Sequence, residues 1–453
     1  MAIVFFERRW KYAVGVLVTL AFLISLGYSF SFRIQPFADG KSYDAIAVNL
    51  LSRREYRENT EGPLANDRGI TPVGPGYEFF LAGVFFLFGR HYEAVWALQA
   101  LFHALTVLLV FLIAKKMFGA EWKNITGSNG WSPVAGMLAA GFVAFSPDLI
   151  IASSMMLTEN VAIFLLALTM WLATSYWREG RLWYVFLMSL TLGFSVLVRS
   201  TLLLLFFVFL VLFWLRKRFL HMLIFIIVFL AVMTPWTVRN YFLYRAFVPT
   251  SITFGDDFLA GNHPQASGEL DESRYPYIEK YQGLSYLAAD REEIKDTVRF
   301  IAADPLHFLK LTVYRVSVYF SFSRPTGWWF FLSGANRAIT LLLSSLYSVL
   351  LFSFGFFGAW RGWKDATTLE QKQKIFLFFA SVLMMPFSIM FIIVETRYRY
   401  PIYPLLAVFA GYGAWILWRD RKKVLRDFLI VFVLLFSNTL FDVARNWSRI
   451  VER

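Results

Sequence analysis

Two carboxylates stand where apolar segments end or begin, and they are the leading candidates for acid–base chemistry. Asp39 comes shortly after one apolar segment, and Glu159 stands close to the start of another. A carboxylate in such a position can accept a proton from a hydroxyl or an amine. The alternatives are a solvated Asp-Gly turn at Asp39 and an interfacial charge without a role at Glu159. Asp44 is a weaker candidate, because acids favour the first turn of a helix through its dipole alone.

Four arginines form the second group of candidates. Arg199 lies between two apolar segments, and Arg239, Arg397 and Arg399 lie at the ends of others. A guanidinium group can form two parallel hydrogen bonds to one phosphate, so these residues could bind a phosphorylated lipid. The alternative is that each of these side chains extends to ordinary lipid headgroups.

Few residues indicate a metal, a nucleotide or a nucleic acid. The chain has no cysteine and five histidines, and no histidine pair has the spacing of a metal site. His263 could donate a hydrogen bond, and a divalent metal stays an option without a supporting motif. There is no Gly-rich phosphate loop. The net charge of +13 fits basic cytoplasmic loops and anionic headgroups, so we do not predict nucleic acid as a partner.

The composition shows what must hold these residues in place. The chain is 58% hydrophobic and 17% charged, whereas a soluble domain has about 45–50% apolar and about 25% charged residues. Lipid must therefore cover part of the surface, and a helix that crosses a bilayer needs about 20 apolar residues. We predict an all-α polytopic membrane protein with about eleven transmembrane helices. The predicted spans are 11–31, 92–116, 132–150, 156–177, 182–198, 200–215, 219–238, 338–360, 374–394, 402–418 and 427–441.

The basic residues predict the orientation of these spans. Clusters at 8–11, 115–116, 216–218 and 419–423 all fall on one side of the arrangement. By the positive-inside rule, that side is the cytoplasm. Two long segments, 32–91 and 239–337, then lie on the opposite side, where the candidate residues are concentrated. Only Arg199 separates the predicted spans 182–198 and 200–215. This spacing predicts either a tight turn at Arg199 or one long helix.

The two long segments carry shorter helical patterns. An amphipathic helix over 42–51, capped by Ser42, fits a position on the membrane surface. The apolar stretch over 77–90 is too short for a span and suits an interfacial or re-entrant helix. The aromatic stretch over 305–323 is also expected to be interfacial, because a span there would reverse the orientation of the later basic clusters.

Several motifs, taken in order, resemble a known family. They are Asp39 before the surface helix, Gly74-Pro75-Gly76-Tyr77, Leu157-Thr158-Glu159, Thr234-Pro235-Trp236-Thr237-Val238-Arg239-Asn240, Gly261-Asn262-His263-Pro264 and Arg397-Tyr398-Arg399-Tyr400-Pro401. Together they resemble bacterial members of the GT-C superfamily of integral-membrane glycosyltransferases. Relatives in that group are the protein O-mannosyltransferases and the lipid A aminoarabinose transferase.

The resemblance implies a transferase that moves a sugar from a polyprenyl-phosphate donor to a glycan, lipid or protein acceptor. Asp39 matches the catalytic acid of the first outer loop, and Glu159 matches the acid of the second. Gly40 stands where relatives often have a second adjacent acid, which weakens any case for a metal-binding pair. The other predicted roles are donor phosphate binding for Arg199, Arg239, Arg397 and Arg399, and lining of the substrate pocket for Tyr43, Asp44, Asn262 and His263.

The resemblance also implies a location and a domain plan. We expect a multi-pass protein of the bacterial inner membrane whose active site faces the periplasm. A single transmembrane domain is expected over 1–453, without the separate C-terminal soluble domain that relatives often carry.

Two other functions fit a chain of this kind. A lipid-linked saccharide transporter or flippase is one, although such proteins place charges near the bilayer midplane and often contain repeats. Here the ionisable residues stand at the outer ends of spans, and no repeat is visible. An O-antigen polymerase or ligase is the other, although these usually carry their large outer loop late in the chain.

Overall fold

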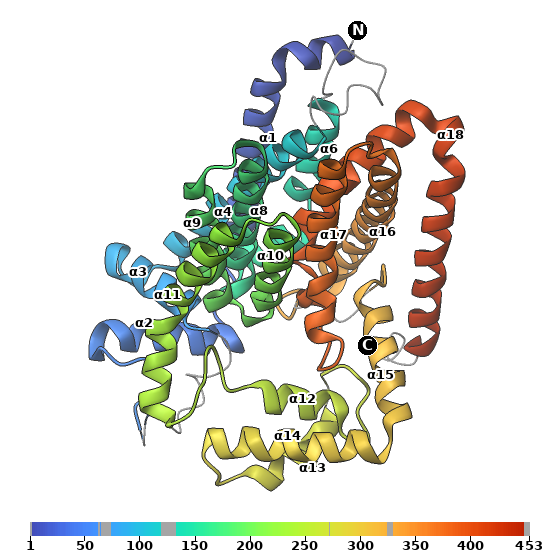
Figure 1. Cartoon of the computed structure of the whole chain (residues 1–453). Helices are drawn as coiled ribbons and strands as arrows, with labels where there is room; N and C mark the ends of the chain where they lie inside the picture. The colour runs from blue at the N-terminus through green and yellow to red at the C-terminus, as the bar shows by residue number, and fades with distance from the viewer. Residues whose placement is uncertain are drawn as a thin grey trace.

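The computed structural model describes residues 2–61, 64, 74–118, 133–270, 272–323 and 329–447. Within these ranges the chain is helical and forms no β-strand, which confirms the predicted all-α class (Figure 1). The helices are α1 (Ala2–Phe32), α2 (Asp39–Arg53), α3 (Gly76–Phe88), α4 (Tyr92–Met117), α6 (Pro133–Ala144), α7 (Pro147–Ser154), α8 (Thr158–Glu179), α9 (Leu182–Val198), α10 (Leu204–Leu215), α11 (Phe219–Tyr244), α12 (Phe254–Asn262), α13 (Tyr275–Ile278), α14 (Tyr286–Ala303), α15 (Pro305–Tyr319), α16 (Gly334–Asp365), α17 (Leu369–Ile389) and α18 (Ile402–Arg445).

The number of helices able to cross a bilayer is smaller than predicted. Seven described helices are long and apolar enough, and α6 with α7, bent by 49°, could form an eighth. The predicted count of about eleven is therefore not confirmed. Three of the predicted spans correspond to short helices (α9, α10) or to the bent pair. The last two predicted spans lie in α18, whose helical geometry breaks at Asp420 (φ −116°, ψ 32°). Figure 1 shows its two parts following different paths from that bend.

The short helices follow the sequence pattern more closely. Helix α3 has 13 residues and α15 has 15, so neither reaches the length of about 20 residues that a span requires. Between α9 and α10 the chain makes a tight turn, with a short 3₁₀ helix over Ser200–Leu203. That turn excludes the alternative of one long helix.

The surface helix α2 differs from its predicted start. It begins at Asp39, three residues earlier than expected. Ser42 is not its cap, because the Ser42 hydroxyl donates a hydrogen bond of 2.8 Å to Glu58 Oε1. The prediction of a Ser42 cap was therefore wrong, and Asp39 is part of the helix rather than of a preceding turn.

Close helix packing holds the membrane bundle together. A Cβ atom on Gly358 of α16 would lie 2.0 Å from the carbonyl oxygen of Phe409, and one on Gly413 would lie 2.4 Å from that of Phe354. Since real Cβ atoms never come so close to an oxygen, only glycine fits at this crossing of α16 and α18. Small residues allow such close approach in membranes, where helix association depends on van der Waals packing.

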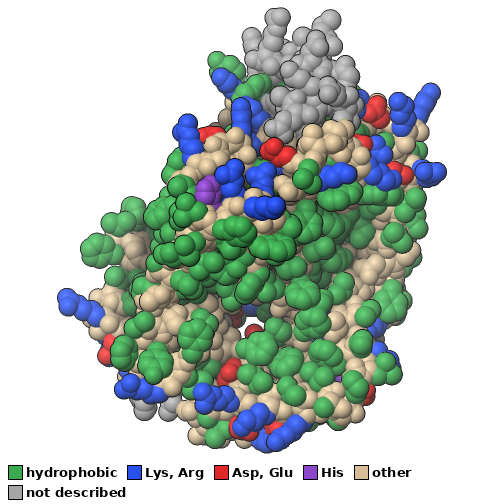
Figure 2. Space-filling model, viewed as in Figure 1, with side chains coloured by type: hydrophobic (Ala, Val, Ile, Leu, Met, Phe, Trp, Pro, Cys, Tyr) green, Lys and Arg blue, Asp and Glu red, His purple; other side chains and the backbone are tan. Residues whose placement is uncertain are grey.

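Basic side chains meet at one end of the bundle. Lys115 Nζ lies 4.2 Å from the ring centre of Trp10, which joins the end of α4 to the start of α1. Arg216 stacks on Trp177 at 4.5 Å and donates a hydrogen bond of 3.1 Å to Gln373. Figure 2 shows basic side chains above and below a broad hydrophobic belt. Helices α12, α13 and α14 lie at the opposite end from the N-terminus (Figure 1).

Candidate functional site

A large cavity lies between the membrane bundle and the helices α12, α13 and α14, which we call the outer helices. Its volume is about 850 Å³, and its lining comes from α2, the start of α8, the turn after α9, the segment 252–293 and the segment 395–398. The ionisable residues in this lining are Asp39, Arg199, Asp256, Asp257, Arg274, Asp290, Glu293, Glu395 and Arg397. The cavity therefore gathers four of the predicted site residues, Asp39, Tyr43, Arg199 and Arg397, from positions far apart in the sequence.

The backbone around Asp39 fixes the direction of this carboxylate. The preceding residue, Ala38, has φ 45° and ψ −126°, a conformation that costs a residue other than glycine about 1–3 kcal/mol. After it, a Cβ atom on Gly40 would lie 3.0 Å from the carbonyl oxygen of Met156. Gly40 thus lets the start of α2 approach the segment before α8, and this contact explains why a small residue follows Asp39.

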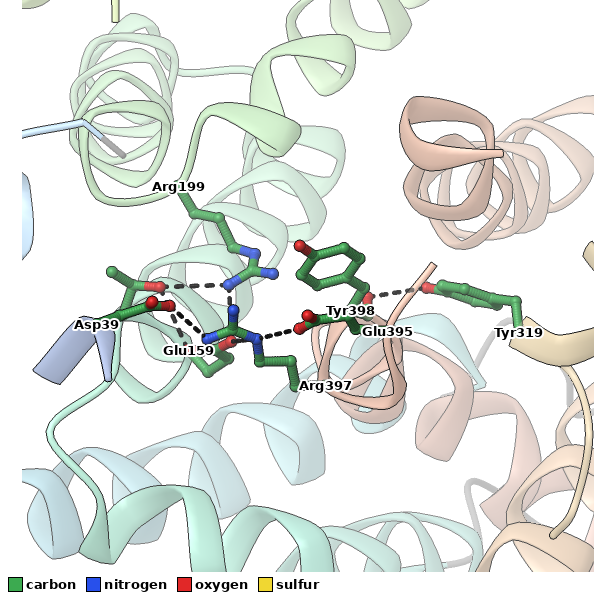
Figure 3. Close-up of polar contacts among 8 residues, drawn as sticks. Asp39, Glu159, Arg199, Tyr319, Glu395, Arg397 and Tyr398 are labelled. Carbon is green, nitrogen blue, oxygen red and sulfur yellow. Dashed lines mark hydrogen bonds and ion pairs between the residues drawn. The ribbon is translucent and has the colours of Figure 1, made fainter. Parts of the chain in front are cut away.

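Two arginines and three carboxylates form an ion-pair network on the side of the cavity next to the membrane bundle (Figure 3). We call this side, which carries Asp39, Arg199 and Arg397, the inner wall, and the opposite side, formed by the segment 252–293, the outer wall. Arg397 Nη1 donates a hydrogen bond of 2.8 Å to Asp39 Oδ2, and its Nε donates one of 2.8 Å to Glu395 Oε2. Arg397 Nε also lies 3.8 Å from Glu159 Oε1. The network therefore links residues that are 358 positions apart in the chain.

Glu159 is the buried centre of this network. Its side chain is 1% exposed, and Arg199 Nη1 donates a hydrogen bond of 2.8 Å to its Oε1. Arg199 Nη1 also lies 3.2 Å from the hydroxyl oxygen of Thr158. Because Glu159 stands in the first turn of α8, the positive end of the helix dipole adds to its stabilisation. Asp39, in contrast, has a side chain that is 35% exposed and faces the cavity.

Tyr43 completes the inner wall, one helical turn after Asp39. The residue is 2% exposed and packs edge-on against Tyr77. It lines the cavity, and its hydroxyl makes no hydrogen bond with the described part of the chain. Burial, followed by the nearby charge of Asp39, raises the pKa of Tyr43 well above its usual value. The hydroxyl therefore stays protonated and can donate a hydrogen bond into the cavity.

The outer wall of the cavity holds ionisable residues that sequence analysis missed. Asp256 and Asp257 stand in the first turn of α12, and Arg274 ends a short 3₁₀ helix over Glu272–Arg274. Burial, then the charges of Asp256 and Glu395, raise the pKa of Asp257 to about 7. The segment that carries these residues is polar and shows no helical or strand periodicity. Two features of the sequence could have indicated a functional role: the adjacent acids Asp256 and Asp257, and the predicted location of the segment on the side opposite the basic clusters. Glu395 was also missed, although it adjoins the Arg397 motif.

Arg399 lies in the protein core rather than in the cavity. Its residue is 2% exposed, and its guanidinium donates to the carbonyl oxygen of Ser321 at 2.8 Å and to the Ser348 hydroxyl at 3.2 Å. Asp148 Oδ2 lies 3.9 Å away. The structure therefore places Arg399 among structural contacts, away from the predicted phosphate-binding group.

Arg239 is also absent from the cavity lining. Its guanidinium contacts Asn240 Oδ1 at 2.9 Å and lies over the rings of Trp236 and Tyr56, at 4.7 and 5.4 Å from their centres. Asp44 turns away as well, because Arg90 holds its carboxylate through two hydrogen bonds of 2.5 and 3.3 Å. Neither residue contacts the site in this structure.

Asn262 and His263 have structural contacts in place of the predicted pocket role. Asn262 Nδ2 donates to the carbonyl oxygens of Phe258 and Phe391 at 2.9 and 3.0 Å. His263 is fully buried and stacks on Tyr277 with ring centres 4.6 Å apart. Neither side chain lines the cavity, so both stabilise the outer helices without reaching its interior.

Arg315 joins the outer helices to the end of α17, just before the segment 395–398 that carries Glu395 and Arg397. It donates to the carbonyl oxygens of Gly261, Gly268 and Met390 and to Asn262 Oδ1. Burial lowers the pKa of this guanidinium to about 10. Since each contact is a neutral oxygen, the residue acts as a cationic clamp on backbone carbonyls.

No metal centre is built by the residues that the structure describes. Within these ranges, no group of three or more His, Cys, Asp or Glu side chains could hold a metal ion. The carboxylates at the inner wall are instead bonded to arginines, as Figure 3 shows.

Comparisons with known proteins place the chain in a structural context. Residues 72–238 match the family model described as dolichyl-phosphate-mannose-protein mannosyltransferase. No curated protein sequence matches the chain. The matched range includes Glu159 and Arg199, and excludes Asp39 and Arg397.

Two solved structures, ArnT and an archaeal oligosaccharyltransferase, resemble most of the chain. Apo ArnT from Cupriavidus metallidurans has a TM-score of 0.51 at 12% identity, and the match covers 90% of this chain and 60% of ArnT. The oligosaccharyltransferase AglB from Archaeoglobus fulgidus, in complex with an inhibitory peptide and a dolichol-phosphate, has a TM-score of 0.53 at 15% identity. That match covers 96% of this chain and 55% of AglB.

These matches confirm the predicted resemblance at the level of the fold: the chain shares its fold with ArnT and AglB, and residues 72–238 are similar to the mannosyltransferase family model. The chain spans a little over half the length of the two solved proteins.

Proposed function

We propose that this protein transfers a sugar from a polyprenyl-phosphate donor to an acceptor on the extracytoplasmic side of a bacterial inner membrane. The observation that carries this proposal is the position of Asp39. Its carboxylate is partly exposed to a cavity of about 850 Å³ and is held by Arg397. The GT-C fold supports the reaction class, and AglB with bound dolichol-phosphate supports a lipid phosphate as the donor's carrier.

Asp39 serves as the general base in this proposal. Its Oδ2 accepts the hydrogen bond from Arg397, while its Oδ1 bonds to no described residue. The free oxygen takes a proton from the acceptor hydroxyl or amine as that group attacks the anomeric carbon. The bond between the anomeric carbon and the phosphate oxygen breaks, and the polyprenyl phosphate leaves with the bonding electron pair. Attack from the face opposite to the phosphate inverts the anomeric configuration.

Arg199, Arg397 and Glu159 position the reacting groups. Glu159 bonds to Arg199 and lies close to Arg397, so it keeps two guanidinium groups beside Asp39. Their positive charge lies next to the place where the phosphate gains negative charge, and charges fixed in advance lower the barrier without reorganisation. Tyr43 can donate a hydrogen bond to the sugar or to the acceptor.

Access from the membrane fits the shape of the molecule. Figure 2 shows a hollow near the lower edge of the hydrophobic belt, with acidic side chains visible inside it. An opening at this level allows a lipid carrier to keep its isoprenyl chain in the bilayer while its headgroup enters the protein.

Transfer by purified protein tests the proposal. Wild type and Asp39→Asn are compared with a panel of radiolabelled polyprenyl-phosphate sugars and an extract of envelope glycolipids as acceptors. We expect a labelled product with wild type and its loss in the mutant, with unchanged expression. Movement of intact donor across proteoliposomes, without a product or hydrolysis, would contradict the transferase and favour a flippase.

A further inference from the structure

Three arginines line the cavity, and they differ in their partners. Arg199 is bonded to Glu159, and Arg397 is bonded to Asp39 and Glu395, each at 2.8 Å. Arg274 forms no ion pair or hydrogen bond with the described residues; its Cζ lies 5.6 Å from the centre of the Tyr275 ring, and its charge acts on Asp257 without a direct bond. The charge of Arg274 is therefore the least neutralised of the three.

The charge balance of the cavity makes this difference important. Its lining has six carboxylates and three guanidinium groups: Asp39, Asp256, Asp257, Asp290, Glu293 and Glu395 against Arg199, Arg274 and Arg397. Because the inner-wall arginines are held by acids, an incoming phosphate must break existing ion pairs to bind them fully. Arg274 can bind a phosphate oxygen without that cost.

Apolar side chains share the cavity lining with Arg274. Leu270, Tyr275 and Leu284 line the same cavity and are 42%, 54% and 47% exposed. Exposed side chains of this kind lose contact with water when an apolar ligand covers them. A cation beside apolar side chains suits a ligand that joins an anionic headgroup to a hydrocarbon chain.

We propose that Arg274 binds the phosphate of a polyprenyl-phosphate ligand, with Leu270, Tyr275 and Leu284 contacting the first isoprenyl units. This inference rests on the proposed function and assigns one of its binding residues. It places the phosphate between the outer wall, which binds it, and the inner wall, where Asp39 accepts the proton. The arginines of the inner wall then stabilise the charge that develops during transfer.

Binding of undecaprenyl phosphate to the full chain in nanodiscs tests the assignment. Arg274→Gln is compared with Arg291→Gln, which changes an exposed arginine of α14 outside the cavity lining. We expect Arg274→Gln to raise Kd about tenfold or more, the effect of losing one charge-assisted hydrogen bond. Arg291→Gln should change Kd less than twofold. Arg274→Lys, which keeps the charge, should recover part of the affinity.

The outcomes separate the inference from the proposed function. Arg274→Gln with wild-type affinity, while wild type binds and transfers, would overturn the role of Arg274 alone. Failure of wild type to bind any polyprenyl phosphate would overturn both. Inorganic phosphate tests the source of the anion: displacement of the lipid at equal concentration would overturn the lipid assignment, and weak displacement supports it.

Discussion

Arg397 and Arg399 are two residues apart in one 3₁₀ helix, Thr396–Arg399, yet they serve different regions of the molecule. Arg397 points to the cavity and bonds to Asp39, whose side chain is partly exposed. Arg399 points to the core and lies near Asp148, whose side chain has no exposure. A 3₁₀ helix has three residues per turn, so side chains two positions apart point in directions that differ by about 120°.

The partners of the two arginines explain what each region does. In the core, Asp148 also accepts hydrogen bonds from Ser344 and Tyr403, at 2.6 and 2.9 Å, so its oxygens are occupied. At the cavity, one oxygen of Asp39 bonds to no described residue and the side chain meets solvent. A saturated ion pair holds helices together, whereas an incomplete one beside a cavity is available for chemistry.

Asparagine at the two aspartates gives the largest expected contrast. Asp39→Asn removes the proposed base and should lower the transfer rate about 10²–10⁴-fold, while stability should change little, because Arg397 keeps its hydrogen bond to Glu395. Asp148→Asn should instead destabilise the fold, because it removes the negative charge that balances the buried Arg399. Transfer rates and thermal unfolding in detergent measure both variants. If both variants lost the same transfer rate and neither lost stability, the distinction between a catalytic Asp39 and a structural Asp148 would be wrong.

Replacing the two arginines sharpens the same contrast. Arg399→Gln leaves Asp148 without its cation in the core, and breaking such a buried pair costs about 3–5 kcal/mol. Arg397→Gln should reduce transfer sharply. It should destabilise the fold less than Arg399→Gln, because Asp39 and Glu395 line the cavity, where water can solvate carboxylates that have lost their arginine. Denaturation curves and single-turnover rates test the pair. A less stable Arg397→Gln than Arg399→Gln would contradict the assignment.

Glu395→Gln should have a smaller effect than either arginine change. Its carboxylate accepts the Arg397 Nε hydrogen bond at 2.8 Å, so it orients the guanidinium that holds Asp39. We expect a lower kcat with little change in KM, because Glu395 acts through Arg397 rather than on the substrate. Glu395→Asp should restore part of the rate. A change confined to KM would instead place Glu395 in contact with substrate.

The pH dependence of ligand binding gives the smallest expected effect. Asp257 has a pKa of about 7, raised by burial and by Asp256 and Glu395, with Arg397 and Arg274 acting in the opposite direction. Below that pH Asp257 becomes neutral, and repulsion of a bound phosphate decreases. Affinity for undecaprenyl phosphate should therefore fall severalfold as the pH rises from 6 to 8.

Asp257→Asn is the matched control for this titration. The variant lacks the titrating carboxylate, so its affinity should vary less over the same pH range. The ionisation of the phosphate itself is common to both proteins, and the difference between their curves isolates Asp257. Identical curves would exclude Asp257 as the titrating group.

The sequence predicted the inner wall better than the outer wall. Asp39, Glu159, Arg199 and Arg397 stand at the ends of apolar segments, and a bilayer forces such ends to one level, so their convergence could be expected. The direction of Arg399 could not be predicted, because it depends on the conformation of a short 3₁₀ helix. Arg274 lies in a polar segment without periodicity, whose path is set by tertiary contacts such as the Arg315 clamp.

The contact of Gly40 with Met156 limits how the catalytic chemistry could change over evolution. A side chain at position 40 would bring its Cβ atom to 3.0 Å from the Met156 oxygen, so a second carboxylate beside Asp39 requires α2 and the segment before α8 to separate by a few tenths of an ångström. A shift from an arginine-held acid to an acid pair would therefore require wider spacing between these two elements as well as a new side chain. The distance between two backbone segments thus constrains which catalytic strategy is within reach of point mutation.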